Sequence, residues 1–466
     1  MNCHKRSGAR LRRVLFVGSA MLFVGCGDLF RRNVVARAND HILTEDWFAE
    51  VLVEGRVQLN PTVVEQWAWM WLQYSLFLQG IARGDSFTDT ATVMEAMWPA
   101  VLTSTVEAYF RRLVSEQVLV DSAVLDSVYE AGDHRIIDHI MIRADERYSA
   151  DERETRRRRA EIMRDRLAAG TSWVSEAQTS DDHATRASQG RLGLIARGEA
   201  VPEFEEAAFM LEPGELSDVV ETADGYHLVR RPPLEEVREE YADQIRALLT
   251  ERWRRDFTDA LAQRYNIQVV DNGPEIIRDA AARPIRAMAL DRGRLIGAYD
   301  GGDLTDVDYV GWLQALPVLE LRSVGGAKDE QLKQMAGNAM RWEVLFLEAK
   351  SVGTTLSDST YTVIKEEFGG RLSRVRNAMK VDSAMMHAGA GEREPIARDL
   401  LDQYMVGILV AGDRVTLVPP FLARKLRREA DWQFSYGGLD RAILKAEQLR
   451  SARDTIETQK ARSSAR

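Results

Sequence analysis

Two histidines, His139 and His227, stand where this sequence could build a binding or catalytic site. Each lies within a short apolar segment, 135–143 and 225–229, of the kind that forms a buried strand. A single histidine in mid-strand is more often a packed core residue than a reactive one. Two of them, separated by an ordered series of polar, glycine-containing and apolar motifs, indicate a site built from two strands of one small domain.

The motifs between the two histidines follow a recognisable order. They are Ser180-Asp181-Asp182-His183, Gln189-Gly190-Arg191-Leu192-Gly193, Val201-Pro202-Glu203-Phe204-Glu205-Glu206-Ala207-Ala208-Phe209, Pro213-Gly214-Glu215-Leu216-Ser217 and Gly225-Tyr226-His227-Leu228-Val229. The series resembles a parvulin-type (PpiC or rotamase) peptidyl-prolyl cis-trans isomerase domain. The wider chain is similar in plan to lipoprotein foldases of the SurA and PrsA types.

The chemistry that this resemblance implies needs no nucleophile, metal or other cofactor. Rotation about an X-Pro amide is opposed by a barrier of about 18–20 kcal/mol, because the bond has partial double-bond character. An isomerase lowers the barrier by binding the twisted amide better than either planar form. An apolar surface that grips the proline ring, a dry environment and well-placed hydrogen-bond donors are sufficient for this.

The resemblance also implies roles for individual residues. His139 and His227 match the paired histidines beneath the parvulin site, whose mutual hydrogen bonding would fix their tautomers. Thr222 matches the hydroxyl residue that bonds this pair. Asp182 matches the acidic residue beside it, and His183 takes the next position; the sequence does not separate their roles, because loop length varies in the family.

A proline pocket is the second part of the expected site. Phe204 and Leu192 would line it, with Ala200 where the family usually has Met. Gln189 replaces the first glycine of a common pair, and Arg191 replaces the usual Asp. These departures keep open an alternative, in which the domain has the parvulin shape and binds peptides with little turnover.

The first residues predict an exported, lipid-anchored protein. Basic residues at positions 5–13 precede the mainly apolar segment Val14 to Gly25. This segment is shorter than the roughly 20 residues of a membrane-spanning helix, so it is typical of a secretory signal. It ends in Leu22-Phe23-Val24-Gly25-Cys26, which resembles a lipobox, with Phe23 in place of the usual Leu. We therefore expect lipidation at Cys26; the alternative is an ordinary signal peptide with an incidental cysteine.

Charge and composition exclude several other functions. The formal net charge is −10, which disfavours binding to nucleic acid. The sequence has no HExxH, P-loop, GxSxG or CxxC motif, and its histidines lack metal-ligand spacing. Because Cys3 would leave with the signal, the mature chain would have no internal disulfide.

The expected location is the bacterial envelope, most simply the periplasmic face of the outer membrane.

We expect an α+β chain, in which the parvulin domain, a small antiparallel sheet with surrounding helices, is inserted between mainly helical, chaperone-like segments. The expected parts are a signal peptide (1–25), a tether (26–33), an N-terminal helical segment (34–133), the parvulin domain (134–232), a long helix and strand that pack back on the N-terminal segment (233–272), a second mostly helical lobe (273–451) and a polar tail (452–466). Residues 293–370 read as a diverged repeat of 34–130, with Thr44 and Thr305 in register.

A run of arginines and a group of tryptophans could each be functional or purely structural. Arg156 to Arg159 could clamp a phosphate, but consecutive residues point around a helix, and Glu152 and Glu154 sit at ion-pairing spacing. A solvated helix face is favoured. Trp67, Trp69 and Trp71 could form an adaptable client surface, but their segment is apolar around most of a helix, which favours burial.

The sequence therefore favours a prolyl isomerase and chaperone that assists the folding of exported envelope proteins. The clients would be unfolded, proline-containing chains, and no nucleic acid is expected as a partner. The alternative is a holdase, a peptide-binding lipoprotein whose parvulin domain is weak or vestigial. Nothing specific favours a structural lipoprotein of a surface assembly.

Overall fold

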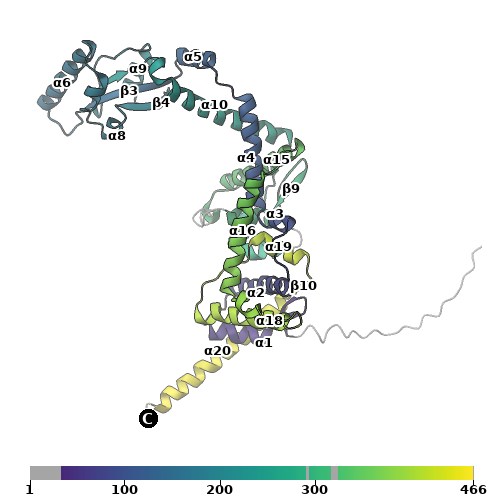
Figure 1. The fold of residues 1–466 in the computed structure, drawn as a ribbon. Helices are drawn as coiled ribbons and strands as arrows, with labels where there is room; N and C mark the ends of the chain where they lie inside the picture. Colours follow the sequence, from purple (N-terminus) through teal and green to yellow (C-terminus); the bar gives the residue numbers. More distant parts are fainter. Residues whose placement is uncertain (1–32, 290–292, 316–323, 465–466) are drawn as a thin grey trace, which may run out of the picture.

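The structure is a computed structural model that describes residues 33–289, 293–315 and 324–464. The predicted signal peptide (1–25), the lipidation site Cys26 and nearly all of the tether lie outside the described residues. Figure 1 shows an elongated molecule: a small domain at one end, an arm of two helices, and a tall stack of helices. We call these parts the distal domain, the arm, the central body and the terminal body.

The distal domain is built on a four-stranded antiparallel sheet of order β4-β3-β6-β5. Its middle strands, β3 and β6, are buried on both faces along almost their whole length. Ile140 and Leu228 pack against helix residues Met163 and Trp173 on one side of the sheet. The elements are β3 (His134–Arg143), α6 (Ala150–Ala168), α7 (Trp173–Ala177), α8 (His183–Arg186), β4 (Arg191–Ala196), α9 (Pro202–Met210), β5 (Val220–Thr222) and β6 (Gly225–Arg230).

The arm joins this domain to the rest of the chain through α5 (Ser122–Ala131) and the long α10 (Leu234–Arg264). Tyr129 of α5 packs edge-on against Tyr241 of α10, with ring centroids 4.8 Å apart. The far half of α10 reaches α4 (Trp98–Gln117), where Phe257 lies 6.2 Å from Phe110 between ring centroids. The long helix therefore contacts both the sheet of the distal domain and the N-terminal helices.

The central body has its own apolar core, in which Ile277, Tyr309 and Leu332 are buried. It gathers α4 and the end of α10 around a three-stranded sheet of order β7-β8-β9. Its further elements are β7 (Gln268–Val269), α11 (Gly273–Ala282), α12 (Pro284–Ala289), β8 (Leu295–Tyr299), β9 (Gly302–Thr305), α13 (Asp306–Ala315) and α15 (Asp329–Ser351).

The terminal body combines the two ends of the described chain in one core. Helix α2 is buried almost throughout, and Trp69 and Trp71 are both only 3% exposed. The tryptophan cluster is thus core, with Trp69 stacked on Phe434 at 4.1 Å between ring centroids. The elements are β1 (Val34–Ala38), β2 (His41–Thr44), α1 (Glu45–Glu54), α2 (Pro61–Ala82), α3 (Thr90–Ala96), α16 (Asp358–Ala378), α17 (Val381–Met385), α18 (Arg393–Val406), the π-helix η1 (Gly407–Ala411), α19 (Pro420–Arg428), β10 (Trp432–Phe434) and α20 (Tyr436–Ser464).

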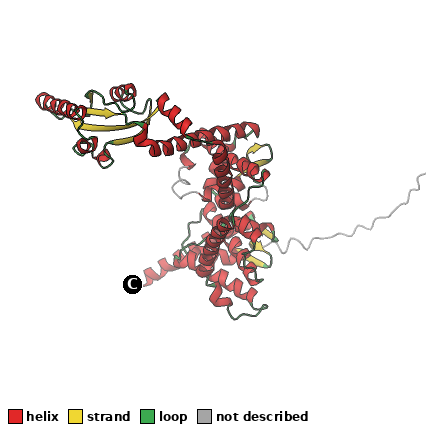
Figure 2. Ribbon diagram, turned by 45° about the horizontal axis from the view of Figure 1, so that its top comes forward, coloured by secondary structure: helices red, strands yellow, loops and turns green. Residues whose placement is uncertain are grey.

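The central and terminal bodies contain the same hairpin-and-helix unit. In both, a short hairpin with an irregularity near the start of its first strand (Val34/Ala36 and Leu295/Gly297) runs into a helix. Thr44 accepts a hydrogen bond from the Trp47 N–H, and Thr305 accepts the equivalent bond from Asp308. Figure 2 shows the two small sheets well separated from the sheet of the distal domain.

Each hairpin is completed by a strand from far along the chain. In the terminal body β10 pairs with β1, so that Ala36 lies opposite Phe434. In the central body β7, which follows α10, pairs with β8. The segment that leads back from the distal domain therefore closes the second hairpin, while the first is closed by a strand near the C-terminal end.

The structure corrects two boundaries. The single lobe expected over 273–451 is divided between two cores, because the apolar faces of 273–351 are covered by α4 and α10, whereas those of 358–451 are covered by α1 and α2. The predicted α+β class, with a small antiparallel sheet between helical segments, is confirmed. The polar tail beyond 452 continues α20 as a helix to Ser464, with exposed side chains over 452–459.

Substitution of one glycine tests the close packing of α20 against β1 in the terminal body. A Cβ on Gly438, in the first turn of α20, would lie 2.0 Å from the carbonyl oxygen of Val34 in β1. Gly438→Ala should therefore lower the free energy of unfolding by about 1–3 kcal/mol, measured by urea unfolding of the full chain. The neighbouring Gly437→Ala is the control, since its Cβ would meet nothing closer than 3.4 Å. Equal stability of the two variants would contradict this packing.

Candidate active site

The site is positioned by the pairing of β3 with β6. His139 lies opposite Val229, and Met141 lies opposite His227. Because side chains alternate between faces along a strand, this register places both imidazoles on one face as diagonal neighbours. Both are buried, with exposed fractions of 6% and 7%.

His139 is held by a carboxylate and a hydroxyl. Its Nε2 lies 2.9 Å from Oδ2 of Asp182 and 3.0 Å from Oγ1 of Thr185. Asp182 is fixed in turn as the N-cap of α8, where it accepts a hydrogen bond from the Ala184 N–H at 3.0 Å. The Thr185 hydroxyl donates to the same carboxylate at 2.6 Å. An ionised carboxylate only accepts hydrogen bonds, so the His139 proton lies on Nε2.

His227 is held by Thr222, the last residue of β5, in the hairpin that β5 forms with β6. The Thr222 hydroxyl oxygen lies 2.8 Å from Nε2 of His227. Gly225, which begins β6, has φ +143°, and a Cβ there would lie 2.3 Å from the Ile142 carbonyl oxygen. The hairpin therefore needs glycine at this point to bring Thr222 and His227 against β3.

The imidazoles and Phe204 form a compact aromatic cluster. The two rings lie nearly parallel, 15° apart, with centroids separated by 5.8 Å. Phe204 meets both rings edge-on, at 5.9 Å from His139 and 5.5 Å from His227. Among the described residues no hydrogen bond joins the two imidazoles, so the expected mutual hydrogen bond is wrong. Each ring is fixed by its own oxygen partner instead.

Burial keeps both imidazoles neutral. It lowers the pKa of His139, against the opposing influence of Asp182. It also lowers the pKa of His227 to about 4, with a further contribution from His139. Burial alone would raise the pKa of Asp182, but hydrogen bonds from Thr185, Ala184 and His139 outweigh it and leave that pKa lowered. At neutral pH the site thus holds one carboxylate and two uncharged rings.

The remaining expected residues lie in different surroundings. His183 is exposed at the first position of α8 and makes no described contact with the cluster. The structure therefore separates the two candidates that the sequence left together: Asp182 contacts His139, and His183 does not. Leu192 lies at the irregularity of β4 and is 38% exposed, while Ala200 packs beside the Phe204 cluster.

Sequence reasoning missed two contributors. Thr185 follows Asp182 by three residues, the spacing at which a helix N-cap meets the end of its first turn, and this signal could have indicated it. The carbonyl oxygen of Gly190 accepts the His139 backbone N–H at 2.8 Å. A Cβ on Gly190 would lie 2.2 Å from the His139 carbonyl oxygen, so this glycine allows the loop to touch the strand.

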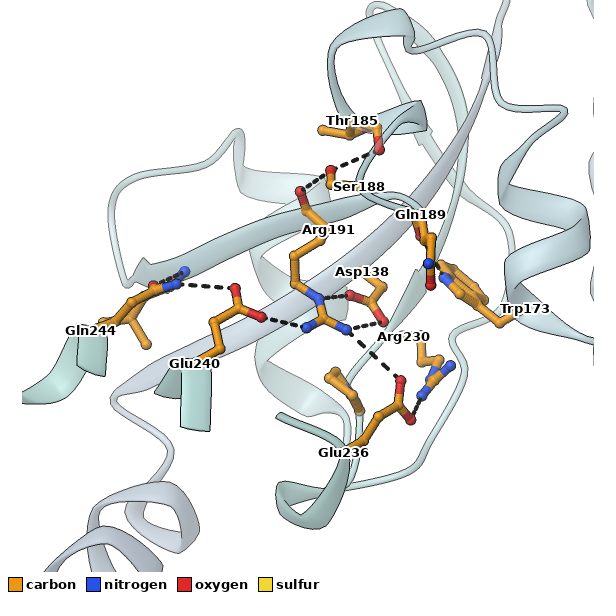
Figure 3. Close-up of polar contacts among 12 residues, drawn as sticks. Asp138, Trp173, Thr185, Ser188, Gln189, Arg191, Arg230, Glu236, Glu240 and Gln244 are labelled. Carbon is orange, nitrogen blue, oxygen red and sulfur yellow. Dashed lines mark hydrogen bonds and ion pairs between the residues drawn. The ribbon is translucent and has the colours of Figure 1, made fainter. Parts of the chain in front are cut away.

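The opposite face of β3 carries an ion-pair network, drawn in Figure 3. Asp138, next to His139 in sequence, is buried and pairs with Arg191. Arg191 also reaches Glu240 of α10 at 2.7 Å and Glu236 at 3.8 Å. Gln244 of α10 accepts the Leu194 N–H at 2.8 Å. The residue that replaces the usual Asp of the family thus ties the sheet to the arm.

The arginine run is a solvated, ion-paired helix face, as the plain interpretation expects. Arg157 contacts Glu154 and Glu161 at 2.8 Å and 2.5 Å. Arg158 contacts Glu154 at 2.9 Å, and Arg156 lies over the Tyr148 ring. In the part of the chain that the structure describes, no group of three or more His, Cys, Asp or Glu residues is placed to hold a metal ion.

The geometry of the distal domain agrees with its sequence relationships. The family profile described as "Rotamase: PPIC-type PPIASE domain" matches residues 139–232. The chain contains a PpiC-type peptidyl-prolyl isomerase domain. We now call the distal domain the isomerase domain.

Two curated relatives agree with this assignment. The foldase protein PrsA of Halalkalibacterium halodurans is 36% identical over 130 residues, which cover 27% of this chain and 39% of PrsA. Chaperone SurA of Nitrosococcus oceani is 42% identical over 93 residues, covering 20% of this chain and 21% of SurA. The solved structure of PrsA from Bacillus subtilis is 22% identical, covers 32% of this chain and 53% of that one, and has a TM-score of 0.21. The chain thus spans well under half the length of these two curated relatives.

Because His227 is buried in its neutral form, the stability of the isomerase domain should fall in acid. Its folded pKa of about 4 lies below the ordinary value of 6.5, so the unfolded chain binds the proton more readily between these pH values. The contribution of His227 to the free energy of unfolding is therefore fully present above pH 6.5 and is lost as the pH falls toward 4. This contribution is about 3 kcal/mol. His227→Gln should reduce this pH dependence, measured by urea unfolding from pH 7 to 4. His183→Gln, at the exposed position, should leave it unchanged; identical pH dependence in both variants would contradict the account.

The ion-pair network predicts that the buried Asp138 carboxylate lowers stability unless Arg191 is present to pair with it. Arg191→Met leaves Asp138 buried without its nearest cation and should cost about 3 kcal/mol of stability. The double variant Asp138→Asn/Arg191→Met should recover most of this loss. Arg238→Met is the control, because its ion pair with Asp126 is exposed and should be worth less than about 1 kcal/mol. If Arg191→Met and Arg238→Met unfold at the same urea concentration, the network does not hold the domain to α10.

Proposed function

We propose that this chain is a foldase of the bacterial envelope, which isomerises X-Pro bonds in exported proteins and holds their unfolded segments. One observation carries the catalytic part: His139 and His227 lie buried and neutral beneath Phe204, with Asp182 fixing one of them. The similarity to chaperone SurA and foldase protein PrsA supports the holding part.

The proposed catalysis involves binding, with no proton transfer to or from the amide. Phe204 offers an apolar edge against which a proline ring can pack. The neutral imidazoles and the fixed Asp182 carboxylate give a preorganised environment, which favours the twisted amide without rearrangement during the reaction. Because both histidine pKa values are lowered, activity should not depend on an imidazolium near neutral pH.

The proposed location is the envelope, with Cys26 carrying the lipid and the chain facing the periplasm from the outer membrane. The apolar segment and lipobox at 14–26 support this, as do the named relatives. Among the helices of the described residues, none is long and apolar enough to cross a membrane. Unfolded, proline-containing exported proteins are the proposed clients.

A second candidate is a holdase that binds proline segments with little turnover. The small Ala200 side chain beside Phe204 favours it, since the wall that would grip the proline ring is thinner there. The two functions predict different responses to the same substitutions.

Proline-limited refolding of a model protein separates the two candidates. If the site catalyses isomerisation, Asp182→Ala and Phe204→Ala should each lower kcat/KM at least tenfold, because they release His139 or remove the apolar contact. His183→Ala should change it less than twofold. Suppression of aggregation by the full chain should be unchanged in all three variants. Wild-type-like acceleration by Asp182→Ala and Phe204→Ala would contradict the catalytic assignment, and no acceleration by the wild type would favour the holdase.

A further inference from the structure

A cavity of about 550 Å³ lies where the central and terminal bodies meet, far along the chain from the isomerase domain. It is formed by residues of α3, α4, α13, α15 and α19. In Figure 1 the labels of α3, α4, α15 and α19 lie together in the middle of the stack. Neither body alone encloses it, because α3 and α19 belong to one core and α13 and α15 to the other. Nothing in the proposed isomerase mechanism uses this cavity.

Aromatic side chains form the walls. Trp98, Trp312, Phe346 and Phe421 all line the space. Trp98 and Phe346 are in edge-to-face contact, with ring centroids 4.7 Å apart. Phe421 lies close against α13, where a Cβ on Gly311 would be 2.3 Å from the ring. These contacts hold the rings in place around the cavity that they line.

One carboxylate in this aromatic setting has no cation. Glu343 of α15 lines the cavity. Among the described residues it has no ion pair, and its hydrogen-bond partners are Trp98 and Trp312. The other acidic side chains there are neutralised: Asp308 pairs with Arg424 at 2.8 Å, and Glu95 pairs with Arg428 at 2.8 Å. Lys350, also lining the cavity, is exposed and makes no described ion pair with Glu343.

We propose that this cavity binds a single basic side chain, Lys or Arg, of an unfolded protein segment. The cation would lie between the aromatic rings and against the Glu343 carboxylate. Aromatic faces attract cations through their quadrupoles, and desolvation strengthens the attraction. The Glu343 carboxylate, which has no cation among the described residues, supplies the complementary charge, which a neutral apolar side chain would leave uncompensated. This binding site is additional to the isomerase site.

The charge of Glu343 makes the binding pH-dependent. Burial raises the pKa of Glu343 to about 7; Asp308 raises it further, while hydrogen bonds from Trp98 and Trp312 oppose the shift. The other charged groups that line the cavity are Glu95, Lys350, Arg424 and Arg428. The carboxylate is therefore mainly protonated at pH 6 and mainly ionised at pH 8. A lysine amine stays charged over this range, so its affinity should rise with pH.

Calorimetric titration of the full chain with two peptides tests the proposal. Both peptides are proline-free, unstructured and blocked at their ends, and they differ only at one central position, Lys or the neutral norleucine. The Lys peptide should bind the wild type more tightly than the norleucine peptide at pH 8. Its affinity should fall about tenfold at pH 6, in proportion to the ionised fraction of Glu343.

Two substitutions on the same helix complete the test. Glu343→Gln should abolish both the preference for lysine and its pH dependence, whereas Glu330→Gln, at an exposed position of α15, should leave both unchanged. Equal affinity of the two peptides for the wild type at pH 8, or an intact lysine preference in a folded Glu343→Gln chain, would overturn the proposal. Because neither peptide contains proline, these outcomes are independent of isomerase activity.

Discussion

The register between β3 and β6 is the constraint on which the isomerase site depends. It places His139 and His227 on one face and Asp138 on the other. A shift of β3 by one residue would exchange the faces of its own side chains: Asp138 would lie on the face of Phe204 and His227, and His139 would lie on the face of the Arg191 ion pairs. The apolar residues of β3 lie on both of its faces and do not by themselves specify the register. The glycine at 225 and the polar partners on each side of the strand do so.

The two faces of β3 serve different purposes through the same physical principle. A buried polar group must find a partner, because an unpaired one costs stability. On one face, Asp182 and Thr185 pair with Nε2 of His139, Thr222 pairs with Nε2 of His227, and burial keeps both rings uncharged. On the other, Arg191 satisfies Asp138 and extends to Glu240 of α10. The strand that carries the site is thus also the strand that holds the domain to the arm, through side chains one residue apart.

The isomerase domain could be predicted from the sequence because its signals are local. Strand periodicity around His139 and His227, and the order of motifs between them, lie within about a hundred residues. The choice between Asp182 and His183 could not be made, because it depends on how α8 begins and which side chain turns toward the sheet. The expected hydrogen bond between the imidazoles failed for a similar reason, since ring orientation depends on Asp182 and Thr222. The partition of 273–451 between two cores depends on β10 pairing with β1, a contact between Ala36 and Phe434 that no local pattern reveals.

The central claim is that both imidazoles of the site are neutral, and that His139 carries its proton on Nε2 toward Asp182. Nitrogen NMR of the histidine side chains in the full chain, labelled with ¹⁵N and assigned with His139→Gln and His227→Gln, measures this directly. The account predicts neutral rings for both residues at pH 7 and a His139 proton on Nε2. A doubly protonated His139 or His227 at pH 7, or a His139 proton on Nδ1, would contradict it.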